Sequence, residues 1–247
     1  MTDRMRADES ASPSLDRRGM LSALGAVVAG GIAGCMGGGS ATTEKDTTEP
    51  TPTTAGGNGL ANHPAGRGIT DQPRLGPAPK DATGVVVAFE DPSCTRCRAF
   101  HRQVLPQLES KLIDPGDVAY VFRSYPVVYP WGEPAVQALE STYAKSEAAH
   151  WQLLDEYFTS QSDYDTDNVF ERTQTFLETN TDVDAAAVVE DARNKVHDSA
   201  VQADLTAGED AGAGQTTPSL FLFRDGEFVT KAAGSISFSV IKNALGL

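Results

Sequence analysis

The sequence has few basic residues and few cysteines. It contains 20 Lys and Arg against 34 Asp and Glu in 247 residues, with a net charge of −14 and an isoelectric point near 4.6. No basic stripe interrupts this acidity, which argues against a nucleic-acid partner. A structural zinc site requires four ligands, and the three cysteines include only one closely spaced pair, which argues against a bound metal. No nucleotide-binding glycine loop and no internal repeat is visible in the sequence.

The closely spaced cysteines follow an apolar run. Residues 85–89 show no solvent-facing alternation, which predicts a buried strand. Pro92 ends this strand because it cannot donate to a sheet ladder. Ser93 is a good helix N-cap, so Cys94 is predicted in the first helical turn and Cys97 on the same face. This spacing brings the two sulfur atoms close enough to form a bridge.

The predicted position of Cys94 at a helix N-terminus favours its ionisation. Unpaired N–H groups and the helix dipole stabilise an anion there, and a thiol attacks a disulfide only as its thiolate. Arg96 and Arg98 add positive charge, so Arg96 is a candidate for tuning the thiolate. We therefore assign Cys94 as the nucleophile and Cys97 as the resolving thiol. A purely structural disulfide is the alternative, although a bridge closing so short a loop constrains the unfolded chain little.

Residues 1–34 have the layout of a signal peptide. An apolar, Gly- and Ala-rich segment follows the pair Arg17-Arg18 and is short for a membrane span. The arginine pair resembles a twin-arginine export signal, and the Ile-Ala-Gly-Cys sequence ending at Cys35 resembles a lipoprotein processing box. This resemblance implies cleavage before Cys35, whose sulfur then carries a lipid. An uncleaved anchor helix is the alternative, and both interpretations place the chain at the extracytoplasmic face of the cell membrane.

Residues 35–74 are rich in Gly, Thr and Pro. Such a composition buries too little apolar surface to offset the entropy of ordering, so we predict a disordered tether. The remaining residues, 75–247, suit one domain.

The acidity resembles that of proteins from halophilic organisms. Excess surface carboxylate keeps such chains soluble at high salt concentration. At low salt concentration the same charges are expected to repel one another and to destabilise the fold.

The order of predicted elements in residues 75–247 alternates strands with helices. The first strand leads to the cysteine-pair helix, which reaches Leu112 and is kinked at Pro106 because proline removes one helical hydrogen bond. An Asp225-Gly226 dipeptide predicts a hairpin near the C-terminus. The other predicted elements are strand 118–122, helices 134–158, 167–177 and 184–205, strands 219–223 and 228–232, and helix 236–245.

This order resembles the thioredoxin fold with a helical insertion, as in the DsbA-like thiol–disulfide oxidoreductases. Three local matches carry the resemblance. Residues 89–94 resemble the acidic approach to the family's redox pair, Thr217-Pro218 resembles its cis-proline loop, and residues 221–227 resemble the thioredoxin hairpin. The resemblance implies an α/β fold in which a helical insert, at about 131–206, lies between the second strand and the Thr-Pro strand.

The resemblance also implies a chemistry. It implies that the redox-active disulfide Cys94–Cys97 carries out the exchange reaction and that no metal or organic cofactor is needed. It implies that Pro218 is cis and faces the pair, and that the Thr217 backbone binds a peptide. The expected partners are thiols and disulfides of exported proteins, and a redox protein that resets the pair.

Two departures from the family pattern leave the direction of exchange open. Thr95-Arg96 replaces the Pro-His dipeptide of strongly oxidising members, and Thr216 stands where many relatives have glycine. The dipeptide between the cysteines sets how well the thiolate is stabilised. A tethered peptide- or ligand-binding lipoprotein with only a structural disulfide is the alternative function.

Further residues near the cysteine pair have two interpretations each. Asp91 or Glu90 could accept a proton from Cys97; for Glu90 we favour a solvated turn carboxylate, and for Asp91 both interpretations stay open. His101 could tune the thiolate, but we favour an exposed helical histidine. Three aromatic residues could equally line a peptide groove or fill the core: Tyr125, Tyr129 and Trp131.

Overall fold

The computed structural model describes residues 59–247. The predicted signal peptide, the predicted lipid-bearing Cys35 and the first part of the predicted tether lie outside these residues. Within 59–247, the helices are too short or too polar to cross a membrane.

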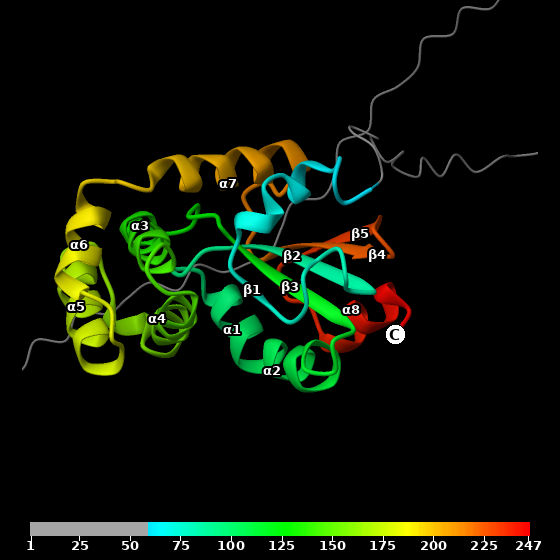
Figure 1. The fold of residues 1–247 in the computed structure, drawn as a ribbon, viewed down its shortest axis with the longest axis horizontal. Helices are drawn as coiled ribbons and strands as arrows, with labels where there is room; N and C mark the ends of the chain where they lie inside the picture. Colours follow the sequence, from blue (N-terminus) through cyan, green and yellow to red (C-terminus); the bar gives the residue numbers. More distant parts are fainter. Residues whose placement is uncertain (1–58) are drawn as a thin grey trace, which may run out of the picture. The chain divides into compact units, whose positions relative to one another are not determined.

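Five strands form one mixed sheet in the order β1–β3–β2–β4–β5 (Figure 1). β2 and β3 are parallel, and the other neighbouring strands are antiparallel. All residues of β2 and β3 are buried, which explains why residues 85–89 of β2 form a continuous apolar run. The strands are β1 (Arg74–Leu75), β2 (Gly84–Glu90), β3 (Val118–Ser124), β4 (Ser219–Arg224) and β5 (Glu227–Ala233).

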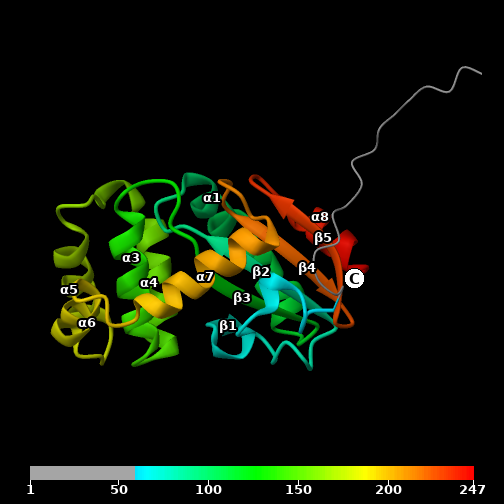
Figure 2. The ribbon, with the colours of Figure 1, turned by 90° about the horizontal axis from the view of Figure 1, so that it is seen from above.

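Helices cover both faces of the sheet (Figures 1 and 2). Val86 of β2 belongs to one core cluster with Phe100, whereas its neighbour Val87 belongs to a second cluster with Ala207. The alternation follows from the pleat, which points successive side chains to opposite faces. The elements of the first face are α1 (Thr95–Gln103), α2 (Leu105–Leu108), η3 (Glu109–Ile113) and α8 (Phe238–Leu245).

The Asp225-Gly226 turn and the helix break at Pro106 both form as the sequence predicts. Asp225 and Gly226 join β4 to β5 with φ values of 50° and 81°, the left-handed backbone that a two-residue hairpin turn requires. α1 ends at Gln103 and α2 begins at Leu105, because Pro106 lacks the N–H that would continue the helix.

A helical insert lies between β3 and β4, which confirms the predicted thioredoxin fold with an insertion. It forms a layer beyond one end of the sheet, and α7 (Asp198–Ala211) returns from it across the second face (Figure 2). The predicted helix 134–158 is two helices, because the chain turns before Ser146, which caps the second helix by accepting a hydrogen bond from the Ala149 N–H. The insert comprises α3 (Gly132–Tyr143), α4 (Glu147–Thr159), η4 (Gln161–Asp163), α5 (Val169–Asn180) and α6 (Ala185–Arg193).

The structure contradicts the end of the tether predicted for residues 35–74, because residues 59–74 are folded as part of the domain. Residues 59–74 include the short 3₁₀ helices η1 (Pro64–Gly66) and η2 (Ile69–Asp71) and cover the second face of the sheet beside α7 (Figure 2). The Ala65 side chain is completely buried there. Composition alone misassigned this part because its stability comes from contacts with distant residues rather than from its own apolar content.

A buried ion pair holds this N-terminal segment in place. The Arg123 guanidinium lies 2.7 Å from Asp204 Oδ1, and both side chains are 1% exposed. Arg123 also donates to the carbonyl oxygens of Ala65 and Arg67, at 2.9 and 2.7 Å. Asp204 in turn accepts a hydrogen bond from the Gln72 side chain at 2.9 Å. The segment is therefore tied to β3 and α7 by one connected polar network.

Candidate functional site

The cysteine pair lies where β2 ends and α1 begins. Cys94 is itself the N-cap of α1, so it precedes the first helical turn instead of lying in it as predicted. Ser93 does not cap the helix, because its N–H and hydroxyl both donate to Asp91 Oδ1, at 2.8 and 2.6 Å. Cys97 is in the first turn of α1 and is completely buried.

Cys94 has a strongly stabilised thiolate. The pKa of Cys94 is lowered to about 5, mainly by a hydrogen bond from the Cys97 thiol. Contact with Thr217 and the backbone N–H groups of Cys97 and Arg96 also lower this pKa, whereas burial opposes the shift. The Cys94 side chain keeps a small exposure of 2%. Arg96 contributes through its backbone N–H, and its side chain is exposed.

Cys97 has the opposite character. Burial, the adjacent Cys94 and the charge of Glu90 all raise the pKa of the Cys97 thiol well above its usual value. Cys97 is therefore protonated at neutral pH while Cys94 is ionised. This division suits a nucleophile paired with a shielded second thiol.

Thr217 and Pro218 lie against the cysteine pair although they are more than a hundred residues away in the sequence. The Thr217–Pro218 peptide bond is cis, as the resemblance implies. The Cys94 Sγ lies 3.4 Å from the Thr217 carbonyl oxygen. Antiparallel pairing of β2 with β4 brings the start of β4 to the end of β2, and this brings the two segments together.

Asp91 organises the loops around Cys94. Its Oδ2 accepts the N–H groups of Val127 and Val128, at 2.9 and 2.7 Å. Burial raises the pKa of Asp91, although its hydrogen bonds with Ser93 and Val128 oppose the shift. Both oxygens of Asp91 are thus used to tie the loop before Cys94 to the loop that follows β3.

The structure contradicts the interpretations that the sequence favoured for Glu90 and His101, a solvated turn carboxylate and an exposed histidine. Glu90 is completely buried as the last residue of β2 rather than solvated in a turn. Its Oε1 lies 3.1 Å from His101 Nε2 and accepts a hydrogen bond from the Tyr120 hydroxyl. The His101 side chain is only 8% exposed, and its ring centroid lies 4.2 Å from that of Phe158. The pairing of α1 with the insert buries this histidine and gives Glu90 a partner.

Gln161 is a site residue that the sequence does not indicate. It belongs to η4 in the insert, and its Nε2 donates to the carbonyl oxygens of Pro92 and Cys94, at 2.7 and 3.1 Å. These bonds fix the backbone just before α1. No motif or spacing signals this role, because the two segments are joined only by the fold.

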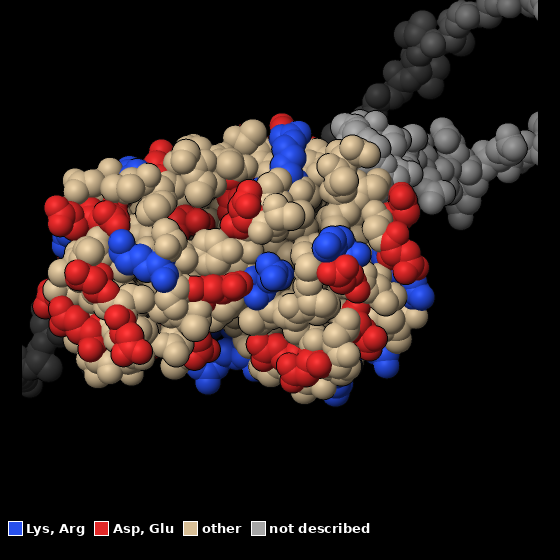
Figure 3. All heavy atoms as spheres, in the orientation of Figure 1, with Lys and Arg blue, Asp and Glu red and all other residues tan. Residues whose placement is uncertain are grey.

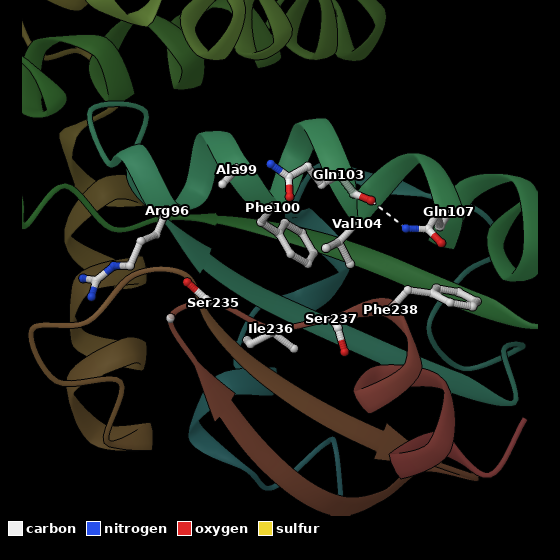
Figure 4. A pocket seen from close by; sticks show the side chains of 11 residues that line it. Arg96, Ala99, Phe100, Gln103, Val104, Gln107, Ser235, Ile236, Ser237 and Phe238 are labelled. Carbon is white, nitrogen blue, oxygen red and sulfur yellow. Dashed lines mark hydrogen bonds between the residues drawn. The ribbon is translucent and has the colours of Figure 1, made fainter.

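A groove lies between α1 and the segment that leads into α8. It has a volume of about 350 Å³. Figure 4 shows Phe100, Ile236 and Phe238 around it, with Arg96 at the end nearest the start of α1. We name it the α1–α8 groove, and its lining residues are Arg96, Ala99, Phe100, Gln103, Val104, Gln107 and residues 234–238.

A second hollow of about 450 Å³ lies on the insert side of Cys94. Tyr129, which is 53% exposed, and Trp131 line it, whereas Tyr125 is 1% exposed and packs edge-to-face on Phe89 in the core. Tyr125 thus fills the core, Trp131 is 7% exposed and packs in the core beside the hollow, and only Tyr129 is exposed. We name this the insert hollow, and its lining residues are Ser93, Thr95, Arg98, residues 129–131, Gln161, Ser162 and residues 164–166.

Across residues 59–247, no group of three or more His, Cys, Asp or Glu side chains is arranged to hold a metal ion.

The fold and the site define a thioredoxin-like protein with a helical insert and a Cys-x-x-Cys pair beside a cis Thr–Pro peptide bond. A family model described as Thioredoxin matches residues 75–241. The chain belongs to this thioredoxin family.

Solved structures share the fold. The oxidised BdbD of Bacillus subtilis superposes with a TM-score of 0.61 at 21% identity, over 72% of this chain and 95% of that one. The alpha-DsbA1 of Wolbachia pipientis gives 0.60 at 20% identity, over 71% and 89% of the chains. The DsbA of Chlamydia trachomatis gives 0.57 at 18% identity, over 71% and 88%.

Curated relatives match over a short stretch. A putative protein-disulfide oxidoreductase of Rickettsia bellii is 39% identical over 46 residues, which are 19% of this chain and 18% of the relative. A protein of the same description from Rickettsia prowazekii is 35% identical over 46 residues, 19% and 17% of the two chains. The chain thus spans less than a fifth of the length of the curated relatives it matches.

Proposed function

We propose that the protein is an extracytoplasmic thiol–disulfide oxidoreductase that forms or exchanges disulfides in exported proteins. In the oxidising direction, a substrate thiolate attacks the Cys94 sulfur of the Cys94–Cys97 disulfide, and the Cys97 sulfur leaves with the electron pair. A second substrate thiolate attacks the substrate sulfur of the mixed disulfide, and Cys94 leaves as a thiolate. The substrate thiols lose two electrons and two protons. The cysteine pair gains both electrons, Cys97 takes one proton, and the other goes to solvent.

We infer that this reaction takes place at the membrane surface. The pair Arg17-Arg18 and the small residues before Cys35 support export and lipid attachment at Cys35. A redox protein of the same compartment would reset the cysteine pair after each cycle. The oxidising conditions outside the cytoplasm favour disulfide formation or exchange over reduction.

One observation carries the proposal: a cysteine with a pKa near 5 lies beside the Thr217 carbonyl group and a second, fully buried cysteine. A stabilised thiolate is what disulfide exchange requires. The alternative, a tethered peptide- or ligand-binding lipoprotein, accounts for the α1–α8 groove but gives no reason for the different pKa values of the two thiols.

Alkylation of the reduced full chain separates these two functions. At pH 6 we expect Cys94 to react with iodoacetamide at least about tenfold faster than an ordinary cysteine, because most of it is already thiolate. Since the pKa of Cys94 is lowered, its labelling rate should fall only as the pH drops through about 5. Cys97 should stay protected. Mass spectrometry of labelled peptides measures both rates, and equal, slow labelling of the two cysteines would favour the binding lipoprotein.

The low pKa of Cys94 also bears on the direction of exchange. A stabilised thiolate favours the reduced form of the pair and thereby makes the disulfide more oxidising. We expect an equilibrium potential against glutathione closer to about −120 mV, as in DsbA, than to about −270 mV, as in thioredoxin. A value at the reducing end would assign the protein to reduction instead.

We infer that Glu90 accepts the proton of Cys97 when that thiol acts as an attacking group. Glu90 is completely buried, and its charge contributes to the high pKa of Cys97. Its link to His101, which retains some exposure, offers the proton a route to solvent. Asp91 is the other candidate, but four hydrogen bonds already occupy its two oxygens.

The pH dependence of the resolving step tests this role. In Glu90→Gln we expect cleavage of a mixed disulfide by Cys97 to slow by about tenfold or more at pH 7, because a general base contributes at least that much. The rate of the variant should then rise with pH, as direct ionisation of Cys97 replaces proton transfer. Asp91→Asn is the control, since a disturbed loop lowers the rate without changing the shape of its pH profile. The opposite pattern would make Asp91 the proton acceptor.

A further inference from the structure

The active-site helix has an unusual charge for this protein. α1 contains Arg96, Arg98 and Arg102 and no acidic residue, whereas the whole chain has a net charge of −14. Figure 3 shows acidic side chains spread over the visible face, including the end formed by α5 and α6. The helix that begins at the reactive cysteine is thus locally basic on an acidic protein.

These arginines are not used for internal ion pairs. Within residues 59–247, no carboxylate lies within 4.0 Å of the guanidinium of Arg96, Arg98 or Arg102, although other arginines there, such as Arg123 and Arg172, are paired. Unpaired cations next to a reactive group are available to a bound molecule.

Two of the three arginines are among the lining residues of the two hollows near the start of α1. Arg96 is the one charged residue that lines the α1–α8 groove (Figure 4). Arg98 lines the insert hollow on the other side of the cysteine. The one carboxylate of that hollow belongs to Asp165, whose Oδ1 already accepts two backbone N–H groups of its own loop. Arg102, one turn or more further along, lines neither hollow.

We propose that Arg96 and Arg98 select substrate polypeptides that carry Asp or Glu on both sides of the reacting cysteine. The inference rests on the proposed function, because it assumes that a substrate cysteine reacts at Cys94. An extended substrate chain that crosses Cys94 beside Thr217 has one flank over the α1–α8 groove and the other over the insert hollow. A carboxylate on each flank would meet one guanidinium, and the apolar lining of the groove accepts the side chains between.

The selection of substrates acts before the redox step and does not change the electrons or protons that this step transfers. Two substrate thiols still become one disulfide, and the Cys94–Cys97 disulfide still becomes two thiols. Complementary charge raises the rate of encounter and disfavours substrates with basic flanks. The net negative charge of the whole chain strengthens this contrast, because it does not favour acidic chains elsewhere on the surface.

Matched dithiol peptides test the proposal on the oxidised full chain. Each peptide contains two cysteines, with the flanks Asp-Asp in one and the neutral, equally shaped Asn-Asn in the other. The readout is the ratio of the second-order rate constants for oxidation of the two peptides. Each rate constant is first divided by that of the same peptide with hydroxyethyl disulfide, because this division removes differences in thiol reactivity. We expect a ratio of about four, the product of two exposed ion pairs that each contribute about twofold.

The variants assign this ratio to particular residues. In the double variant Arg96→Gln/Arg98→Gln the ratio should fall to about one, even if a change in Cys94 reactivity alters both rates together. Arg102→Gln removes one positive charge from the same helix and should keep the ratio. Measurements are made at the lowest salt concentration at which circular dichroism shows all variants folded, because salt screens exposed charges.

Each failure has a separate meaning. A ratio of one in the unaltered protein, or an equal loss in Arg102→Gln, overturns the selection by Arg96 and Arg98. Absence of both oxidation of these peptides and reduction of their disulfide forms by the reduced protein overturns the proposed oxidoreductase function itself, and the binding lipoprotein would replace it.

Discussion

Replacing Cys97 by alanine is expected to abolish turnover and to trap the protein as a mixed disulfide with its substrate. Cys94 keeps its position at the start of α1 in this variant, and its thiolate can still attack a disulfide of a substrate, so that one substrate sulfur leaves as a thiolate and the other stays bonded to Cys94. Without Cys97, nothing inside the protein attacks that bond, so the complex persists. Non-reducing gel electrophoresis would show it as a band that disappears on reduction, and peptide oxidation should fall to the uncatalysed background.

Cys94→Ala is the matched control. It should abolish turnover equally but should form no mixed disulfide, because Cys97 is completely buried and its pKa is raised. A Cys35→Ser background excludes adducts at the third cysteine. Equal trapping by both variants would reverse or remove the assigned roles. Turnover that persists in Cys97→Ala would show that the buried thiol is not the resolving group.

Replacing Arg123 by methionine is expected to lower the free energy of unfolding by about 3–5 kcal/mol, the usual cost of leaving one charge of a buried pair without its partner. Asp204 would stay buried against an apolar side chain. The carbonyl oxygens of Ala65 and Arg67 would also lose their donor, so the N-terminal segment should detach from the sheet. Urea unfolding measures the first effect, and hydrogen exchange of residues 59–72 measures the second.

Arg67→Gln is the control for this effect. Its exposed pair with Asp210 is expected to contribute less than about 1 kcal/mol, and the substitution leaves the backbone carbonyl that Arg123 uses. Where Arg123→Met does not fold, Asp204→Asn offers a milder removal of one charge. An unchanged urea midpoint in Arg123→Met would show that the buried pair does not stabilise the segment.

Much of the redox site follows from short stretches of sequence. The apolar run, Pro92 and the spacing of Cys94 and Cys97 are local features, and each depends only on how a few neighbouring residues pack or bond. The hairpin at Asp225-Gly226 and the break at Pro106 are equally local. Such signals survive folding because the surrounding structure agrees with them.

The start of α1 shows where a local signal loses to a nearby competitor. Ser93 is a favourable cap by itself, but the Asp91 carboxylate accepts both of its donors. The hydroxyl is then turned away from the helix, and Cys94 takes the cap position. The pairing of these side chains depends on loop geometry, which residue preferences do not describe.

The sequence alone determined the strand–cysteine-helix unit and the order of the larger elements, since these depend on backbone preferences and apolar periodicity, and the resemblance to a known family pointed to Thr217-Pro218. Only the tertiary structure decided that Glu90 and His101 are buried together, that Gln161 holds the loop at Cys94, and that residues 59–74 belong to the domain. In each of these cases a polar group is stabilised by a partner far away in the chain. A residue cannot reveal such a partner, because the cost of burying its charge or amide is offset only after the fold has brought the two together.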